Sequence, residues 1–379
     1  MRKELGLGLY SLSGVYGPKD LDEIQAMLTY AVNHGVEYFD VADQYGPAEE
    51  VLGSTLKAYR PRIRISTKVG VTGDGFNLSY DYILTACRRS LMRLQTDYID
   101  LYHVHFDDHA TPVAETIGAL EDLKKDGLIL NYGLGHLSRE RVKAYTEEGR
   151  PVSLMLELSP VAVRSYYELL PLCRDRDLRI IATGTTGRGL LTGRIGPDRV
   201  FDPHDIRSID ALFRRSMHQS ARRVLAKLEE LAARLDKSPV QIAIAWVLGL
   251  ENVDIALVGP SNIAHLQENM GGAGWELPEP ARRQLDAALA REEEWKRGAW
   301  AHDIQDILKG PLSEDRSSAT ADLVYVMEGL VELGMASQQE ILPLFSKLMA
   351  WSRDKGPDAA AHEIRAQLGD MLSRGPAQD

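Results

Sequence analysis

Four polar side chains of this sequence are suited to acid–base chemistry on a carbonyl group, and they are Asp40, Tyr45, Lys68 and His105. A tyrosine hydroxyl can protonate a carbonyl oxygen, and a nearby ammonium group lowers the pKa of that hydroxyl. An aspartate can hold the lysine in place, and a histidine can orient the carbonyl. The four residues lie at or just past the ends of three apolar segments, FDVADQYG, IRISTKVG and IDLYHVHF. The pattern therefore predicts one acid–base site built from segments that are separated in the chain.

Eight short apolar segments predict the β-strands that must position these residues, and amphipathic helical patterns alternate with them. The segments are residues 5–11, 37–43, 63–69, 100–106, 130–136, 153–159, 179–185 and 254–259. Alternating strands and helices are typical of parallel strands joined by right-handed crossovers. Eight such units favour a closed (β/α)8 TIM barrel over an open sheet. In that barrel the loops at the carboxyl ends of the strands hold the catalytic residues.

The sequence after the barrel is helical rather than strand-like. The last barrel helix is expected near residues 278–295. Three further helical segments follow, at residues 319–334, 338–353 and 358–374. Ser337 and Glu340 form a capping-box pattern at the start of the second segment.

We therefore expect a barrel over residues 1–299 and an all-helical appendage over residues 300–379, with a disordered tail at 375–379. The apolar content of the appendage predicts that it packs on the barrel or forms a homo-oligomer interface. Residues 193–210 are predicted to be a long polar loop after the seventh strand, either a lid or a surface insertion.

Composition limits the classes of partner. The chain has 379 residues and a net charge of −11, which argues against non-specific binding to nucleic acid or to an anionic membrane. No apolar run reaches the roughly 20 residues that span a bilayer, and the amino terminus lacks the apolar core of a signal peptide. Cys87 and Cys173 have no metal-ligand spacing. We expect a cytoplasmic protein with free thiols.

Over roughly residues 5–295 the chain resembles the aldo-keto reductases, through the motifs FDVADQYGPAEEVLG, ISTKVG, SLMRLQTDYIDLYHVHF and VGPSNIAHLQEN. The resemblance implies the catalytic tetrad of that family at Asp40, Tyr45, Lys68 and His105. Tyr45 would be the general acid, activated by Lys68 and Asp40. The resemblance also implies NADP or NAD as cofactor and a small-molecule carbonyl or alcohol as substrate.

The same resemblance assigns atypical residues to the nicotinamide ring. Members of the family usually hold the ring with a Ser-Asn pair after strand five, a Gln on strand six and an aromatic residue after strand seven. The matching positions are Gly135 with His136, Met155 and Thr183. Three lost hydrogen bonds and a lost ring stack remove about 2–6 kcal/mol, or roughly 10²- to 10⁴-fold in affinity. The acid–base half of the site is thus expected intact and the hydride half weakened.

The remaining cofactor contacts are implied by two loops. The glycine-rich segment 184–193 matches the pyrophosphate loop of the family, through Gly187, Arg188 and Gly189. Later in the chain, Glu268 and Asn269 match adenine contacts, His265 replaces a basic residue, and Gly259 with Pro260 replaces a Lys-Ser pair for the 2′-phosphate. Without that pair or a nearby arginine, poor discrimination between NADP and NAD is expected.

Two other classes of function use the same residues. A redox-independent isomerase, lyase or dehydratase would use Tyr45, Lys68 and His105 on an enolisable substrate. A binding or regulatory protein would hold a vestigial site, but drift would not be expected to spare all four catalytic residue types, so the tetrad argues against this class. His103 and His105 form an H-x-H pattern that can bind zinc or iron. No carboxylates accompany it at ligand spacing, so we expect no metal and interpret His103 as a satisfied interior histidine.

Overall fold

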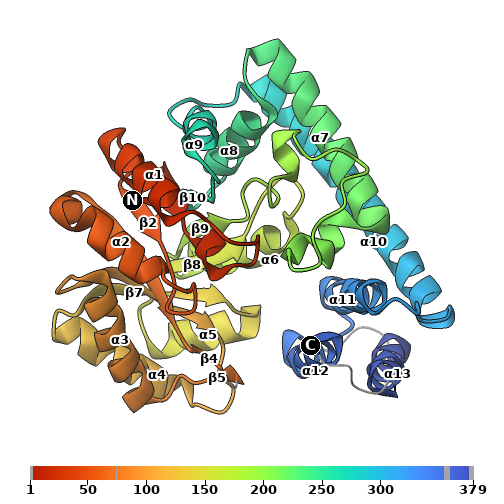
Figure 1. Ribbon diagram of the computed structural model, residues 1–379, viewed down its shortest axis with the longest axis horizontal. Helices are drawn as coiled ribbons and strands as arrows, with labels where there is room; N and C mark the ends of the chain where they lie inside the picture. The colour runs from red at the N-terminus through yellow and green to blue at the C-terminus, as the bar shows by residue number, and fades with distance from the viewer. Residues whose placement is uncertain (1–2, 74, 354–358, 375–379) are drawn as a thin grey trace. The chain divides into compact units, whose positions relative to one another are not determined.

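The computed structural model describes residues 3–73, 75–353 and 359–374, and its eight parallel strands close into a barrel (Figure 1). Around the barrel the strands follow the order β1-β10-β9-β8-β7-β6-β3-β2. Their bounds are β1 Glu4–Gly8, β2 Tyr38–Asp40, β3 Arg64–Val69, β6 Ile99–Phe106, β7 Ile129–His136, β8 Ser153–Glu157, β9 Arg179–Thr183 and β10 Val253–Val258. Each strand coincides with one of the eight predicted segments, except that β1, β6, β7 and β10 begin one residue earlier. The predicted TIM barrel is therefore confirmed.

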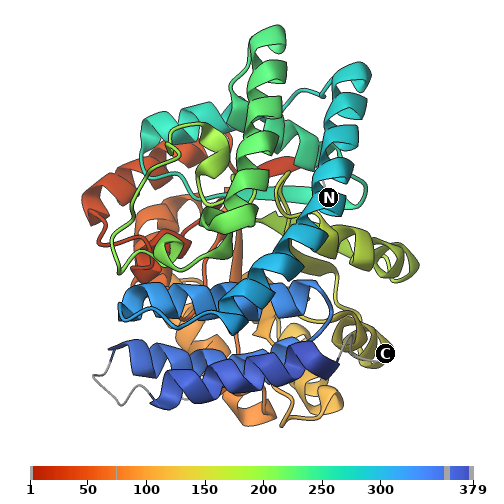
Figure 2. The ribbon, with the colours of Figure 1, turned by 90° about the vertical axis from the view of Figure 1, so that its right-hand side faces the viewer.

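Helices surround the barrel, as Figures 1 and 2 show. They are α1 Leu21–Asn33, α2 Ala48–Leu56, α3 Tyr80–Leu94, α4 Val113–Lys125, α5 Arg139–Glu148, α6 Arg164–Asp175, α8 Pro239–Gly249 and α9 Ile263–Met270. Local sequence sets several of their ends. Asp20 caps α1 by accepting from two backbone N–H groups, and α8 begins with a capping box between Ser238 and Gln241 and a proline in its first turn.

The alternation of side chains along each strand places the site residues. A buried cluster inside the barrel consists of Tyr38, Leu101, Met155, Ile181, Ile255 and Leu257. Asp40 follows Tyr38 by two positions, and Glu157 follows Met155 by two. Since successive side chains of a strand point to opposite faces, residues two apart share the interior face. The polar side chains at the carboxyl ends of the strands therefore lie next to this buried apolar cluster.

The described chain divides into two compact units. The first contains the barrel, residues 3–194 and 228–282. The second contains residues 195–227 together with the chain from residue 283 onward. It includes the short 3-10 helices η4 Ile206–Ser208 and η5 Ala211–Phe213, and parts of α7 Arg215–Leu235 and α10 Glu279–Lys309. It also holds α11 Arg316–Glu332, α12 Gln338–Arg353 and α13 Ala359–Arg374.

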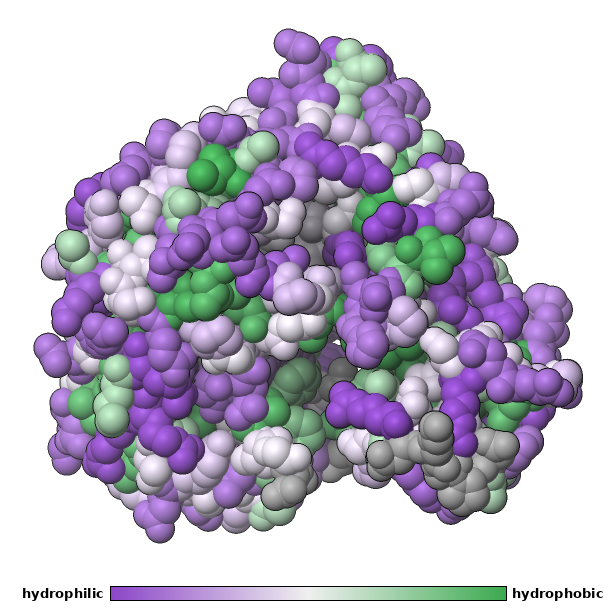
Figure 3. Space-filling view, viewed as in Figure 1, coloured by the Kyte–Doolittle hydropathy of each residue, from purple (hydrophilic) through white to green (hydrophobic). Residues whose placement is uncertain are grey.

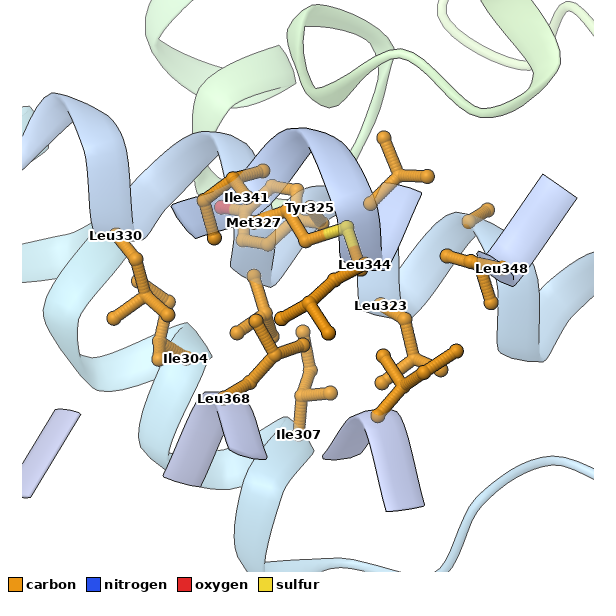
Figure 4. Close-up of a cluster of buried hydrophobic side chains, with 14 of the residues drawn as sticks. Ile304, Ile307, Leu323, Tyr325, Met327, Leu330, Ile341, Leu344, Leu348 and Leu368 are labelled. Atoms are coloured by element: carbon orange, nitrogen blue, oxygen red, sulfur yellow. The ribbon is translucent and has the colours of Figure 1, made fainter. Parts of the chain in front are cut away.

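The second unit has a hydrophobic core of its own (Figure 4). Ile304 and Ile307 of α10 meet side chains from the three C-terminal helices there, among them Leu323, Leu330, Ile341, Leu348 and Leu368. Ile209, Ala211 and Met217 join the same core from the segment after β9. The three predicted C-terminal helices are confirmed. The capping box of α12 is also present, because Ser337 N–H donates to Glu340 Oε2 at 2.9 Å and Glu340 N–H donates to Ser337 Oγ at 3.3 Å.

The organisation of the C-terminal half differs from expectation in two ways. The helix expected to end near 295 runs on as α10 to Lys309, so the expected boundary at 299/300 falls inside one helix of 31 residues. Only the isolated Gly298 interrupts its helix-forming residues before Gly310, and one glycine costs a helix only about 1 kcal/mol. The polar loop expected at 193–210 contributes Ile209 to the core of the second unit. The tail at 375–379 lies outside the described residues.

Candidate active site

A buried ion pair joins β2 and β3 at their carboxyl ends. Lys68 Nζ donates to Asp40 Oδ1 at 2.6 Å and to the carbonyl oxygen of Val41 at 2.6 Å. The side chains of Lys68 and Asp40 are 1% and 6% exposed. Burial raises the pKa of Asp40, while the ammonium group of Lys68 opposes the rise. In the sheet register Asp40 lies opposite Ser66 of β3. Lys68 follows Ser66 by two positions, so the side chains of Asp40 and Lys68 point to the same face, the interior of the barrel.

Tyr45 and His105 complete the cluster. Tyr45 follows β2 in the turn before α2, and it is 9% exposed. Lys68 Nζ lies 4.9 Å from the centroid of the Tyr45 ring, and the rings of Tyr45 and His105 are 5.9 Å apart between centroids. Tyr10, just after β1, packs edge-on against Tyr45 with centroids 5.0 Å apart. The structure therefore brings the four predicted acid–base residues together.

The electrostatic setting of Tyr45 differs from the sequence-based expectation. We expected Lys68 to lower the pKa of the Tyr45 hydroxyl. Instead burial raises the pKa of Tyr45 well above its ordinary value, and the charge of Asp40 adds to the rise. Lys68 directs hydrogen bonds to Asp40 and Val41, so its charge is already partly compensated. Tyr45 is consequently held in its protonated form, which suits a proton donor.

Two histidines of β6 lie inside the barrel with different surroundings. His103 Nδ1 lies 3.1 Å from Ser66 Oγ and its Nε2 lies 3.2 Å from Ser153 Oγ, so His103 is the satisfied interior histidine that we predicted. His105 is 6% exposed, and among the described residues its Nδ1 has no hydrogen-bond partner. Burial, and then the charge of Lys68, lower the pKa of His105 well below its ordinary value. His105 is therefore neutral and able to bind a polar ligand atom.

Within the described parts of the chain, no group of three or more His, Cys, Asp or Glu residues is placed to hold a metal ion.

The residues matched to the nicotinamide ring lie in β7, β8 and β9. A side chain at Gly135 would collide with the carbonyl oxygen of His105, so this position accepts only glycine without a shift of β6. The His136 ring stacks on Phe106 with centroids 5.3 Å apart. Burial lowers the pKa of His136 to about 4, so the ring is neutral. Thr183 ends β9 beside Glu157 of β8.

Met155, the residue matched to the Gln of the family, lies in β8 and is buried. It is 1% exposed and belongs to the apolar cluster in the barrel interior, one layer below the mouth. The inward residue at the carboxyl end of β8 is Glu157, which accepts two hydrogen bonds from the guanidinium of Arg188, at 2.8 and 3.1 Å. Sequence reasoning did not single out Glu157, although the two-residue alternation of β8 places it on the same face as Met155.

The glycine-rich loop after β9 is a run of left-handed turns. The φ angles are 57° at Gly187, 51° at Arg188 and 91° at Gly189. Glycine adopts such angles at little cost. The N–H groups of Gly187 and Gly189 donate to Gly184 and Thr186 carbonyl oxygens in the same loop. Because these two N–H groups are already hydrogen-bonded within the loop, a phosphate bound here would contact other groups of the loop.

The residues matched to the adenosine end lie in α9 and in the segment just before it. Asn262 caps the helix by accepting from His265 N–H at 2.9 Å, and His265 Nδ1 lies 2.7 Å from Ser261 Oγ. Glu268 pairs with Arg194 at 2.6 Å. Asn269 is 5% exposed. Gly259 is exposed, with its Cα facing the carbonyl oxygen of Gly8.

Arg194 corrects the expectation that no arginine lies near this end of the site. Its side chain is 48% exposed and forms an ion pair with Glu268. Burial lowers the pKa of His265, and the charge of Arg194 lowers it further. No local sequence pattern indicates this proximity, because Arg194 precedes Glu268 by more than 70 residues and a folded loop brings them together.

Comparison with known proteins points to one family. Residues 4–290 match the Aldo/keto reductase family. Aldo-keto reductase str7 of Strobilurus tenacellus is 31% identical over 281 residues, covering 73% of this chain and 84% of that protein. Aldo-keto reductase yakc [NADP(+)] of Schizosaccharomyces pombe is 28% identical over 302 residues, covering 76% and 89%. The structure of glycerol dehydrogenase AKR11B4 from Gluconobacter oxydans superimposes with a TM-score of 0.70 at 26% identity, covering 76% of this chain and 91% of that one. The chain belongs to the aldo/keto reductase family.

Proposed function

We propose that this protein is an NADP- or NAD-linked oxidoreductase that interconverts a small-molecule carbonyl and its alcohol, with Tyr45 as general acid in reduction. The observation that supports this most is the buried Lys68–Asp40 pair beside Tyr45 and His105. These side chains lie at the carboxyl ends of the strands, where TIM barrels hold their active sites. Membership of an oxidoreductase family favours this function over the redox-independent one.

Each residue of the cluster has a role in the proposed reaction. Tyr45, kept protonated by its surroundings, donates its hydroxyl proton to the carbonyl oxygen. Lys68 stabilises the phenolate that then forms, and Asp40 holds Lys68 in place. Neutral His105 orients the carbonyl oxygen. A bound reduced nicotinamide would supply the hydride, with its two electrons, that the carbonyl carbon accepts.

The residues around the site resemble those that the family uses for a dinucleotide more closely at the adenosine end than at the nicotinamide end. At the adenosine end, Asn269 and Glu268 are the adenine contacts, and Arg194 supplies a cation for a 2′-phosphate. This arginine supports a preference for NADP over NAD, in place of the poor discrimination expected from sequence. The S. pombe relative carries NADP(+) in its name. At the ring end, Gly135, His136, Met155 and Thr183 replace the usual polar set.

Binding of the cofactor by the wild-type protein tests the proposal most directly. NADPH and NADH are titrated separately while their fluorescence is followed, and turnover is then measured with a panel of small aldehydes and ketones. We expect NADPH to bind and to be oxidised in the presence of a carbonyl. If neither nucleotide binds at millimolar concentration, the redox-independent function replaces this one.

Other properties fit a freely diffusing enzyme of small molecules. No helix in the described ranges is long and apolar enough to cross a membrane. Cys87 and Cys173 are free and buried, in keeping with the cytoplasmic location that we propose. Hydrophilic residues dominate the face shown in Figure 3, with hydrophobic residues in small groups. The proposed homo-oligomer through α11, α12 and α13 is to be tested by analytical ultracentrifugation.

A further inference from the structure

The segment that carries Tyr45 runs from the end of β2 to the start of α2, and both of its ends are attached to β3. At the first end, Lys68 Nζ donates to the carbonyl oxygen of Val41 at 2.6 Å. At the other end, Thr67 Oγ1 donates to Glu49 Oε1 at 2.6 Å, and Glu49 is the second residue of α2. Tyr45 lies between these two attachments.

The two attachments use opposite faces of β3. Thr67 and Lys68 are consecutive, so their side chains point to opposite sides of the sheet. Lys68 points into the barrel, where Asp40 accepts its hydrogen bond, and Thr67 points outward to Glu49 of α2. The segment is therefore held to one strand from inside and from outside the barrel, with Tyr45 near its middle.

Glu49 is a costly residue at this place. Its side chain is 1% exposed, and its other oxygen, Oε2, accepts from Arg93 Nε of α3 at 2.6 Å. A buried ion pair is often no more stable than well-packed apolar side chains of similar volume. The carboxylate supplies direction instead, because a hydrogen bond has a narrow range of length and angle. Glu49 thus fixes the start of α2 relative to both β3 and α3.

The turn between the two attachments is short and internally bonded. Tyr45 N–H donates to the carbonyl oxygen of Ala42 at 3.1 Å, and the carbonyl oxygen of Tyr45 accepts from Ala48 N–H at 3.2 Å. Gly46 has a φ of 55°, and a Cβ atom added there would lie 2.8 Å from the carbonyl oxygen of Leu12. A displacement of α2 would therefore displace Tyr45 as well.

We propose that Glu49 is a positioning residue for the proton donor, which it holds beside Lys68 through its hydrogen bonds to Thr67 and Arg93. The inference rests on the proposed function, in which Tyr45 protonates the carbonyl oxygen. A misplacement of about 1 Å at a catalytic group can cost roughly 100-fold in rate. Glu49 lies on the outer side of the barrel wall, so its effect should fall on kcat and not on cofactor binding.

The test removes the hydroxyl that Glu49 binds. Thr67→Val deletes this hydroxyl and keeps the size of the side chain, whereas Thr67→Ser keeps the hydroxyl. We expect Thr67→Val to lower kcat for carbonyl reduction by about tenfold with an unchanged Kd for NADPH, and Thr67→Ser to restore most of the wild-type kcat.

Thr116→Val is the matched control for the loss of a buried hydrogen bond. Like Thr67, Thr116 is 0% exposed, and its Oγ1 donates to the carbonyl oxygen of Leu78 at 3.0 Å. Thr116→Val and Thr67→Val should both lower the melting temperature, because each loses a buried hydrogen bond. Only Thr67→Val should lower kcat.

A second measurement does not depend on turnover. Tyrosine is replaced by 3-fluorotyrosine throughout the chain, and the fluorine resonance of Tyr45 is identified as the one that Tyr45→Phe lacks. With no ligand added, this resonance should shift in Thr67→Val and return to the wild-type position in Thr67→Ser. It should stay unchanged in Thr116→Val.

The possible results separate this inference from the proposed function. If wild-type protein binds neither nucleotide and reduces no carbonyl, the proposed function fails and this inference with it. If wild-type protein is active and Thr67→Val leaves either kcat or the Tyr45 resonance unchanged, the proposed function stands and this inference is overturned. An equal loss of kcat in Thr67→Val and Thr116→Val also overturns it, since the loss would then reflect general destabilisation.

Arg93→Gln decides the question if Thr67→Val fails to fold, as judged by circular dichroism. Arg93 is the other partner of Glu49, and its side chain is 28% exposed, so the site tolerates a polar replacement better than Thr67 does. Arg93→Gln should lower kcat and shift the Tyr45 resonance in the same way. A wild-type kcat in Arg93→Gln would overturn the inference.

Discussion

Lys68 Nζ and Asp40 Oδ1 lie 2.6 Å apart between neighbouring strands, and both side chains are almost fully buried. Removing two charges from water is costly, and their attraction repays the cost only with good geometry and further hydrogen bonds. Here the carbonyl oxygen of Val41 supplies a second acceptor for Lys68. Such a pair is a poor source of stability, and the reaction that we propose gives a reason for its place beside Tyr45.

This relationship predicts an unequal response to mutation. Lys68→Met leaves Asp40 buried without its partner, so the free energy of unfolding at neutral pH should fall by about 3–5 kcal/mol. The double variant Lys68→Met with Asp40→Asn should recover most of that loss of stability. Lys68→Met and the double variant should both lose activity. Urea unfolding of wild type, both single variants and the double variant measures the coupling. If the double variant is no more stable than Lys68→Met, the pair is not the dominant interaction of Asp40.

The role of Tyr45 predicts a loss of turnover without a loss of structure. Tyr45→Phe removes the proton donor and keeps the ring that packs against Tyr10 and His105. Activity should fall by at least about 100-fold, the contribution typical of general acid catalysis. Cofactor affinity and melting temperature should change little. Tyr167→Phe, at a tyrosine that is 55% exposed, is the control. Near-full turnover of Tyr45→Phe would place the proton donor elsewhere.

Asp43 predicts a pH dependence of stability. Burial, followed by the charge of Glu49, raises its pKa to about 7. The folded state therefore holds the proton more tightly than the unfolded state, where an aspartate has a pKa of about 3.9. The stability associated with protonated Asp43 is fully present below about pH 4 and is lost as the pH rises through about 7.

Asp43→Asn should accordingly be more stable than wild type above pH 7, by roughly 1–4 kcal/mol, and should gain little near pH 4. Denaturant unfolding at several pH values measures the difference. Asp175→Asn, at a side chain that is 69% exposed, should show no such trend. A difference between Asp43→Asn and wild type that stays constant with pH would mean that the pKa of Asp43 is the same in the folded and the unfolded state.

The sequence predicts the barrel well because the relevant patterns are local. Alternating apolar residues and helix caps locate every strand, and the ends of three of them locate Asp40, Lys68 and His105. The errors involve interactions over long distances in the chain. Arg194 meets Glu268 through a folded loop, and α10 continues because Ile304 and Ile307 have a core to enter. The raised pKa of Tyr45 depends on burial, which no sequence pattern measures.

Arg194 predicts cofactor selectivity. If its guanidinium group binds a 2′-phosphate, Arg194→Gln should weaken NADPH by about 10- to 100-fold, because a charge-assisted contact is lost, and should leave NADH nearly unchanged. Fluorescence titration with the two nucleotides gives both affinities. Arg174→Gln is the matched control, since Arg174 is also paired with a glutamate and 53% exposed. An equal loss for NADPH and NADH would assign Arg194 to Glu268 alone.

The second unit predicts that the C-terminal helices cannot be removed without loss of structure. A chain ending at residue 299 is cut inside α10 and lacks α11, α12 and α13. Ile209, Ala211 and Met217 would then lose the core in which they are buried. We expect this fragment to be less soluble than the full chain, with a lower melting temperature in thermal unfolding.

A chain ending at residue 374 keeps every described helix and should behave as the full chain does. A soluble fragment of residues 1–299 with an unchanged melting temperature would show that residues 195–227 fold without the C-terminal helices, contrary to the single core that they share in the structure.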